Sequence, residues 1–145
     1  MSQEPNASVS NYPPLPCNGL VYRLARKKDW LDPDRPKLTP AAFFRRPPRD
    51  EHDRGDEDGL SVNPTHSCSL EDAKSGFNGA VLKKVHGVAT LHVGWVRDLG
   101  LEVVQDEEQH AAIQGLPYHT ENPADANRIA GALADLSRLV WPERE

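Results

Sequence analysis

The chain has little of what marks a disulfide-stapled, membrane-spanning or polyanion-binding protein. Its 145 residues contain two cysteines, Cys17 and Cys68, which are too few for a disulfide framework, so we expect free thiols. No apolar run approaches the roughly 20 residues of a membrane-spanning helix, and the start of the chain lacks the basic and apolar segments of a signal peptide. A net charge of −5 argues against a general attraction to polyanions. We therefore expect a cytoplasmic protein without membrane contact.

Apolar and aromatic residues are also scarce, at 37% and 6%, whereas there are 13 prolines. This composition indicates an ordinary core that carries long polar segments. We predict a proline-rich extended tail over residues 1–18 and a single α+β domain over residues 19–145. The charged run near residues 47–58 cannot bury itself, and we expect it to form a mobile acidic loop.

The expected fold is a small mixed or mainly antiparallel sheet with a C-terminal amphipathic helix packed on it. Apolar runs between turn signals predict strands at residues 19–24, 41–44, 59–62, 85–89, 101–104 and 110–114. A capping box from Ser69 to Asp72 begins a short helix, whereas residues 76–84 fit a helix and a strand equally.

Two further helices are expected from residue spacing. Leu91, Trp95 and Leu99 recur every four residues, which predicts a buried helical face that ends at Gly100. Gly94 lies inside this helix, where glycine is unfavourable, so we expect a close neighbour to require it. The chain then turns at residues 106–108.

The C-terminal helix has the clearest boundaries. Asn122 is a suitable N-cap, and Pro123 fits the first helical position. Pro142 would end the helix. One buried stripe is expected from apolar residues at spacings of four, three and four: Ile129, Leu133, Leu136 and Val140.

Candidate catalytic residues are few, because the chain has no glycine-rich phosphate loop and no Gly-x-Ser-x-Gly elbow. The candidates are Arg23, Ser61 and His110. His110 begins a predicted strand after an acidic turn and could act as a general base supported by Asp106, Glu107 or Glu108. The same placement also fits a histidine that only hydrogen-bonds the turn. We expect no cofactor and no metal site, because the four ligands of a structural zinc are not present at suitable spacing.

Basic residues suggest a second kind of contact. A nucleic-acid or phosphate contact is possible where they cluster, although a solvated surface explains the same residues. The residues concerned are Arg26, Lys27, Lys28, Arg45 and Arg46.

Short motifs along residues 20–116 resemble a group of small bacterial proteins of unknown function. The resemblance implies no activity. It rests on Tyr22-Arg23, Ala42-Phe43, Gly59-Leu60-Ser61-Val62, Gly94 with Arg97 and Leu99-Gly100, and residues 110–115.

The tyrosine-arginine strand at Tyr22-Arg23 also resembles the RES-type toxins, which look like ADP-ribosyltransferases and consume NAD. The resemblance implies that Arg23 contacts a pyrophosphate, which a planar guanidinium suits well. It covers the first strand and, loosely, the segment that ends at Asn63. The family's glycine-rich Arg-Trp-Asn segment is replaced here by residues 59–63, and a late catalytic glutamate is missing.

Three functions follow from these observations. The first is a non-enzymatic binding or accessory module that acts with a protein partner in a bacterial cytosol. The second is an NAD- or nucleotide-processing enzyme of the ADP-ribosyltransferase-like type. The third is a component that contacts nucleic acid through a basic surface.

Overall fold

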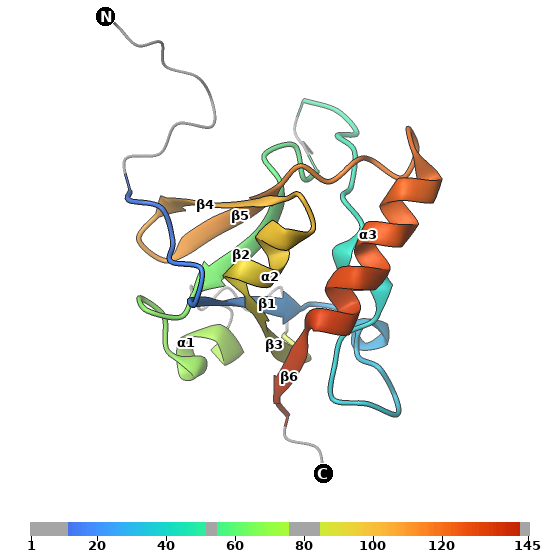
Figure 1. Cartoon of the computed structure of the whole chain (residues 1–145). Coiled ribbons are helices and arrows are strands. Elements are labelled where there is room, and N and C mark those ends of the chain that lie inside the picture. The colour runs from blue at the N-terminus through green and yellow to red at the C-terminus, as the bar shows by residue number, and fades with distance from the viewer. Residues whose placement is uncertain (1–11, 52–54, 76–84, 143–145) are drawn as a thin grey trace, which may run out of the picture.

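The computed structural model describes residues 12–51, 55–75 and 85–142. In these ranges the chain forms one six-stranded antiparallel sheet of order β4-β5-β2-β1-β3-β6 with three α-helices (Figure 1). The strands are β1 Leu20–Ala25, β2 Leu60–Pro64, β3 Gly87–His92, β4 Glu102–Glu107, β5 His110–Gln114 and β6 Arg138–Trp141. The helices are α1 Leu70–Ser75, α2 Val93–Asp98 and α3 Pro123–Leu136, with 3-10 turns η1 Lys28–Trp30 and η2 Pro40–Phe43. The predicted α+β class is confirmed.

The sheet consists of two halves that join over a short distance. β1 pairs with β3 along its whole length, from Leu20 to Ala25, but with β2 only at Val21 and Tyr22. Beyond Tyr22 these two strands no longer pair. We call β1, β3 and β6 the first half, and β2, β5 and β4 the second half.

The main core lies between the sheet and α3, which runs beside it in Figure 1. Leu133 and Ala130 of α3 are fully buried there, together with Phe43 of η2. A smaller cluster forms on the other face of the first half, where α1 packs Ala73 against Leu24 and Val88. The first half is therefore covered by helices on both faces.

The C-terminal helix packs as predicted but is shorter. α3 ends at Leu136, so the prediction that Val140 continues its stripe is wrong. The Ser137 hydroxyl donates to Ala134 O (2.7 Å) and accepts from the amide of Leu38 (3.0 Å), which ends the helix against a distant loop. The residues that follow, Leu-Val-Trp, favour a strand and form β6 on β3.

Three other boundaries differ from the sequence prediction. Residues 41–44 are not a strand, because Pro40 starts the 3-10 turn η2 instead. Leu91 belongs to β3, and Trp95 is 51% exposed, so the predicted buried face of Leu91, Trp95 and Leu99 does not exist. β4 extends to Glu107, which moves the turn from residues 106–108 to Glu108 and Gln109.

Several local predictions are confirmed. Ser69 and Asp72 cap each other's backbone amides at 3.0 and 3.3 Å, and Asn122 accepts from the amide of Asp125 (3.2 Å). Gly100 has a φ of 88° after α2. Residues 76–84, whose sequence fits a helix and a strand equally, lie outside the described residues.

The proline-rich segment lies across α2. The amide of Gly94 donates to Cys17 O at 2.8 Å, and a Cβ on Gly94 would lie at the same distance from that oxygen. Glycine is therefore required at this position, as predicted. Arg97 Nη1 donates to Leu15 O (2.7 Å), and Leu15 is buried. Within the described residues, none of the helices combines the length and the apolar character needed to cross a membrane.

Candidate functional site

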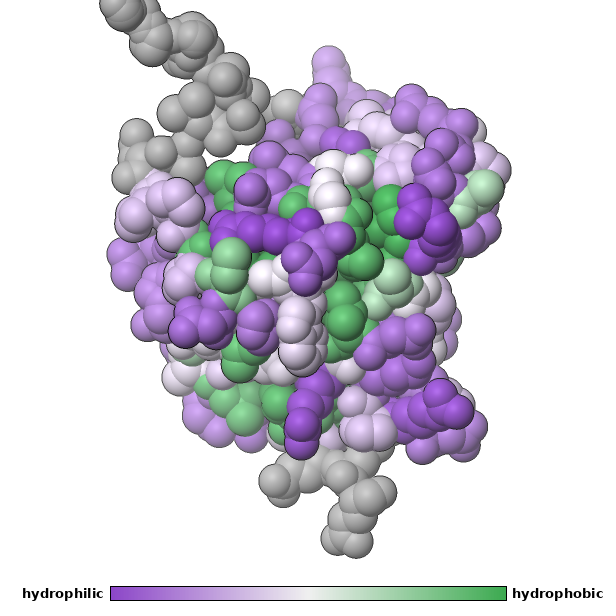
Figure 2. Space-filling view, viewed as in Figure 1, coloured by the Kyte–Doolittle hydropathy of each residue, from purple (hydrophilic) through white to green (hydrophobic). Residues whose placement is uncertain are grey.

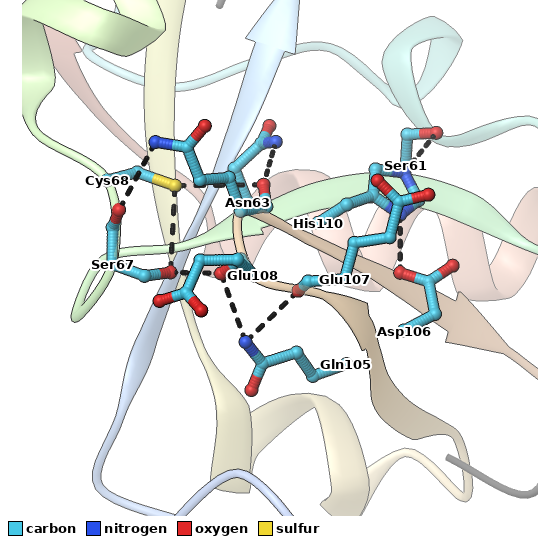
Figure 3. A network of polar contacts seen from close by, with 10 residues as sticks. Ser61, Asn63, Ser67, Cys68, Gln105, Asp106, Glu107, Glu108 and His110 are labelled. Atoms are coloured by element: carbon cyan, nitrogen blue, oxygen red, sulfur yellow. Dashed lines mark hydrogen bonds and ion pairs between the residues drawn. The ribbon is translucent and has the colours of Figure 1, made fainter. Parts of the chain in front are cut away.

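A Ser–His–Asp chain lies on the second half of the sheet. His110 Nε2 is 3.1 Å from Ser61 Oγ, and His110 Nδ1 is 2.7 Å from Asp106 Oδ1 (Figure 3). The three residues come from β5, β2 and β4. Val62 and Ala111, the sequence neighbours of Ser61 and His110, are fully buried, so the chain lies on the face opposite to the main core.

A β-bulge places Asp106 beside His110. Gln105 pairs with Ala111 and Glu107 pairs with His110, which leaves Asp106 as the extra residue of β4. A bulge re-aims the side chain that it carries, and bulges are frequent next to active sites. Asp106 and His110 keep 46% and 34% of their side-chain surface exposed, so a substrate in solution has access to them.

The hydrogen-bond partners of the two His110 nitrogens define the chemistry that Ser61, His110 and Asp106 can perform together. An ionised carboxylate only accepts hydrogen bonds, so we assign the proton of the His110 ring to Nδ1, the nitrogen that faces Asp106. Nε2 of a neutral imidazole then accepts the hydroxyl of Ser61. This is the arrangement in which a histidine deprotonates a serine nucleophile while a carboxylate orients the ring.

Arg23 meets Ser61 from the buried side of the sheet. Its Nη1 donates to Ser61 O (2.9 Å), and its Nε and Nη2 donate to Ala42 O (3.0 and 2.6 Å). The guanidinium also lies 5.2 Å from the ring centroid of Trp30. Arg23 therefore spans the place where β1 and β2 separate, and it holds the main chain of Ser61 and not its hydroxyl.

The charge of Arg23 is buried. Burial lowers the pKa of Arg23 to about 10, with nearby Asp56 acting in the opposite direction and Arg26 and Arg46 adding to the decrease. The group still carries its proton at neutral pH. The described part of the chain places no carboxylate in contact with it.

The other two predicted catalytic residues both contact Ser61. Arg23 binds its carbonyl oxygen, and His110 binds its hydroxyl. The sequence offered Asp106, Glu107 and Glu108 equally as partners of His110, and the structure places Asp106 against its ring. The only sequence signal was an acidic residue four positions before a histidine. The catalytic roles themselves stay predictions.

The turn that precedes His110 is held by side chains from both sides (Figure 3). Asn63 Nδ2 donates to Gln109 O at 2.6 Å. Gln105 Nε2 donates to the carbonyls of Glu107 and Glu108, both at 3.1 Å, and Ser67 Oγ also donates to Glu108 O. Asn63 and Gln105 are both buried. The position of His110 is therefore tied to β2 and to β4.

The predicted phosphate-contact residues have different surroundings. Arg45 donates to the carbonyls of residues 56, 57 and 116 and stacks on Tyr118 at 4.1 Å, so its guanidinium holds the acidic loop. Arg46 pairs with Asp56 at 3.6 Å. Lys27 and Lys28 are exposed and Arg26 is half-buried. A phosphate contact through these residues stays a prediction.

Another surface lies where β1 and β3 reach α2. Trp95 stacks on His92 with ring centroids 4.5 Å apart, and Leu20, which pairs with His92 across the strands, is 40% exposed. A groove of about 210 Å³ lies nearby, between the proline-rich segment and Val93. Figure 2 shows that apolar side chains reach the surface in patches over the middle of the face in view, between polar ones.

Known proteins add nothing to this geometry. A comparison of the chain with protein-family models, with curated proteins and with solved structures finds no match. Within the described ranges, no three histidine, cysteine, aspartate or glutamate side chains form a group that could hold a metal ion. The functional argument therefore rests on the chain of Ser61, His110 and Asp106.

Proposed function

We propose that the protein is an enzyme that transfers a group from an electrophilic substrate through the hydroxyl of Ser61. The observation that carries this proposal is the continuous hydrogen-bond chain from Ser61 Oγ to His110 Nε2 (3.1 Å) and from His110 Nδ1 to Asp106 Oδ1 (2.7 Å). The same constellation serves nucleophilic catalysis on unrelated folds, so it is recognised by its geometry.

The steps follow from the positions of the protons. Ser61 Oγ attacks the electrophilic centre and forms a bond to it, while its proton moves to His110 Nε2. The imidazolium then returns that proton to the leaving group. Water or another hydroxyl acceptor gives its proton to His110 Nε2, attacks the group on Ser61 and releases it, and the proton passes back to Ser61 Oγ. Asp106 stays ionised and holds Nδ1–H throughout. The partial exposure of His110 and Asp106 suits an activated acyl or phosphoryl group that is presented from solution.

A fluorophosphonate probe tests the proposal directly. Ser61 Oγ would form a bond to phosphorus, fluoride would leave, and the proton would pass to His110. We expect one adduct on Ser61 by intact and peptide mass spectrometry. Ser61→Ala should abolish the adduct, and His110→Gln should slow its formation by roughly 10²–10⁴-fold.

Ser75→Ala provides the matched control. The Ser75 hydroxyl donates to Asp72 O at the end of α1, the helix that packs on the first half of the sheet. Its removal should leave labelling unchanged. Failure of the wild-type protein to react, or an adduct that survives Ser61→Ala, would refute the proposal.

A second candidate function is the NAD- or nucleotide-processing activity implied by the resemblance to RES-type toxins. It is supported by the contact of Arg23 with Ser61 and by the lack of a carboxylate on the Arg23 guanidinium in the described chain. Arg23 would have to release a carbonyl before it could reach a pyrophosphate, which places this candidate second. Release of nicotinamide from NAD, lost in Arg23→Lys and in His110→Gln, would support it, and no release would end it.

A third candidate function is that of an accessory module that acts with a protein partner in a bacterial cytosol. It is supported by the exposure of Trp95 (51%) and Leu20 (40%) on one surface. Large aromatic side chains are enriched at protein interfaces. A partner that co-purifies with the wild type and is lost from Trp95→Ala would support this role, and retention by the variant would count against this surface.

A further inference from the structure

We propose that Asn63 and Gln105 are positioning residues for the Ser61–His110 pair. This inference rests on the proposed function, because it names the residues that set the distance between the nucleophile and its base. Neither side chain touches the reacting atoms. Each acts through the end of β4 and the turn at Glu108 and Gln109, which comes immediately before His110.

The side chain of Asn63 connects β2 to the residue before β5. It follows Ser61 by two residues on β2, so both side chains lie on the same face of the sheet. Its amide donates at 2.6 Å to the carbonyl of Gln109, the residue before His110. One side chain therefore ties the strand of the nucleophile to the start of the strand of the base.

Gln105 holds the same turn from β4. Its amide donates to Glu107 O and Glu108 O at 3.1 Å each, and it immediately precedes Asp106. Since Asp106 is the bulged residue, its direction depends on the backbone on either side of it. The Gln105 amide fixes that backbone on the His110 side.

Burial is what distinguishes these two amides from ordinary turn contacts. Asn63 and Gln105 are only 8% and 6% exposed. Carbonyls of a short surface turn can be hydrated by water, and burying a polar side chain to reach them costs free energy. Two buried amides are thus poorly explained by stability alone, whereas they fit a need for fixed geometry.

The test removes the donors and keeps the shape of the side chains. Asn63→Asp replaces the donating NH₂ by an oxygen, and Gln105→Met removes both donors at similar volume. Each should lower the rate of fluorophosphonate labelling by roughly 10–100-fold, because a misplacement of about 1 Å can cost that much. The pH at which the labelling rate is half-maximal should also move, which a loss of stability alone would not cause.

Asn127→Asp is the matched control, since it makes the same chemical change on an exposed position of α3. It should leave labelling and its pH profile unchanged. If it lowers labelling as much as Asn63→Asp does, net charge and not position is responsible, and the inference fails.

A second readout separates this inference from the proposed function. NMR of ¹⁵N-labelled protein reports the Nδ1–H proton of His110 and its exchange with water, with no need for activity. In both variants we expect that proton to exchange faster. If the wild type does not react with the probe, the proposed function fails, while a change in this proton still supports positioning. Wild-type labelling and an unchanged proton in both variants would overturn it.

Discussion

Side chains alternate between the two faces in both halves of the sheet, but the first half buries both faces and the second half buries mainly one. In the first half, α3 packs on one face and α1 on the other, so Val88 and Ala89, successive residues of β3, are both fully buried. In the second half, one face contributes Leu60 and Ile113 to the core, while the other face carries the polar chain of Ser61. Within the described residues, the smaller apolar cluster on that side of the sheet includes no residue of β2, β4 or β5, so polar side chains can occupy this face without replacing core residues.

The largest difference between the halves should be the loss of unfolding free energy caused by large-to-small substitutions. Leu133→Ala, in the α3 core on the first half, should lower the free energy of unfolding by about 3 kcal/mol, because it leaves a cavity among packed side chains. Val104→Ala, a half-buried residue that pairs with Ala112 in the second half, should lower it by less than about 1 kcal/mol. Urea denaturation measures both values. Equal losses would contradict the view that the halves differ in packing.

Removal of Arg23 should have the next largest effect, because this residue joins the halves. Arg23→Met leaves Ala42 O and Ser61 O without their buried donors, which should cost about 2–3 kcal/mol of unfolding free energy. Arg23→Lys should recover only part of this, since an ammonium cannot reproduce the planar fork.

Arg138→Met, an exposed position of β6, is the control for the loss of a positive charge and should change stability by less than about 0.5 kcal/mol. Hydrogen exchange should also show faster exchange of the β2 amides than of the β3 amides in Arg23→Met. Uniform acceleration across the sheet would argue against a role at the junction.

Features that depend on neighbours in the chain were predictable from the sequence. The caps at Ser69 and Asn122 need only residues three positions away, and the stop at Gly100 needs only a glycine. The C-terminal helix followed from its periodicity, but its end did not. That end depends on Ser137 meeting the amide of Leu38, 99 positions away.

The candidate site divides in the same way. Ser61 and His110 were identifiable as chemically competent residues, because their types and local settings were visible. Their meeting was not, since it depends on the register of β2 with β5, and the partner Asp106 depends on a bulge that no residue type signals. Arg23 was predicted to contact a ligand, and that role stays a prediction. Its burial and its hydrogen bond to the carbonyl of Ser61 depend on strand pairing, which the sequence did not show.

The smallest expected effect is a pH dependence that arises at the edge of the second half. Arg97 Nε lies 2.7 Å from Glu102 Oε1, and the same guanidinium holds Leu15 of the proline-rich segment. Partial burial opposes the change, but hydrogen bonds from Arg97 and from the amide of Val103 hold the pKa of Glu102 below its ordinary value of 4.5. A carboxylate whose pKa is lowered on folding contributes stability above its unfolded pKa and loses it as the pH falls through the folded value.

Acidification from pH 6 to below 4.5 should therefore remove this contribution. Since Glu102 is 56% exposed, solvent screening limits it to less than about 0.5 kcal/mol. Glu102→Gln should lower stability slightly at pH 6 and make the acid side of the stability curve flatter, whereas Glu121→Gln, an exposed residue before α3, should do neither. Urea midpoints across this range measure the difference. An equally steep decline in Glu102→Gln would mean that the edge of the second half contributes nothing to the acid sensitivity of the fold.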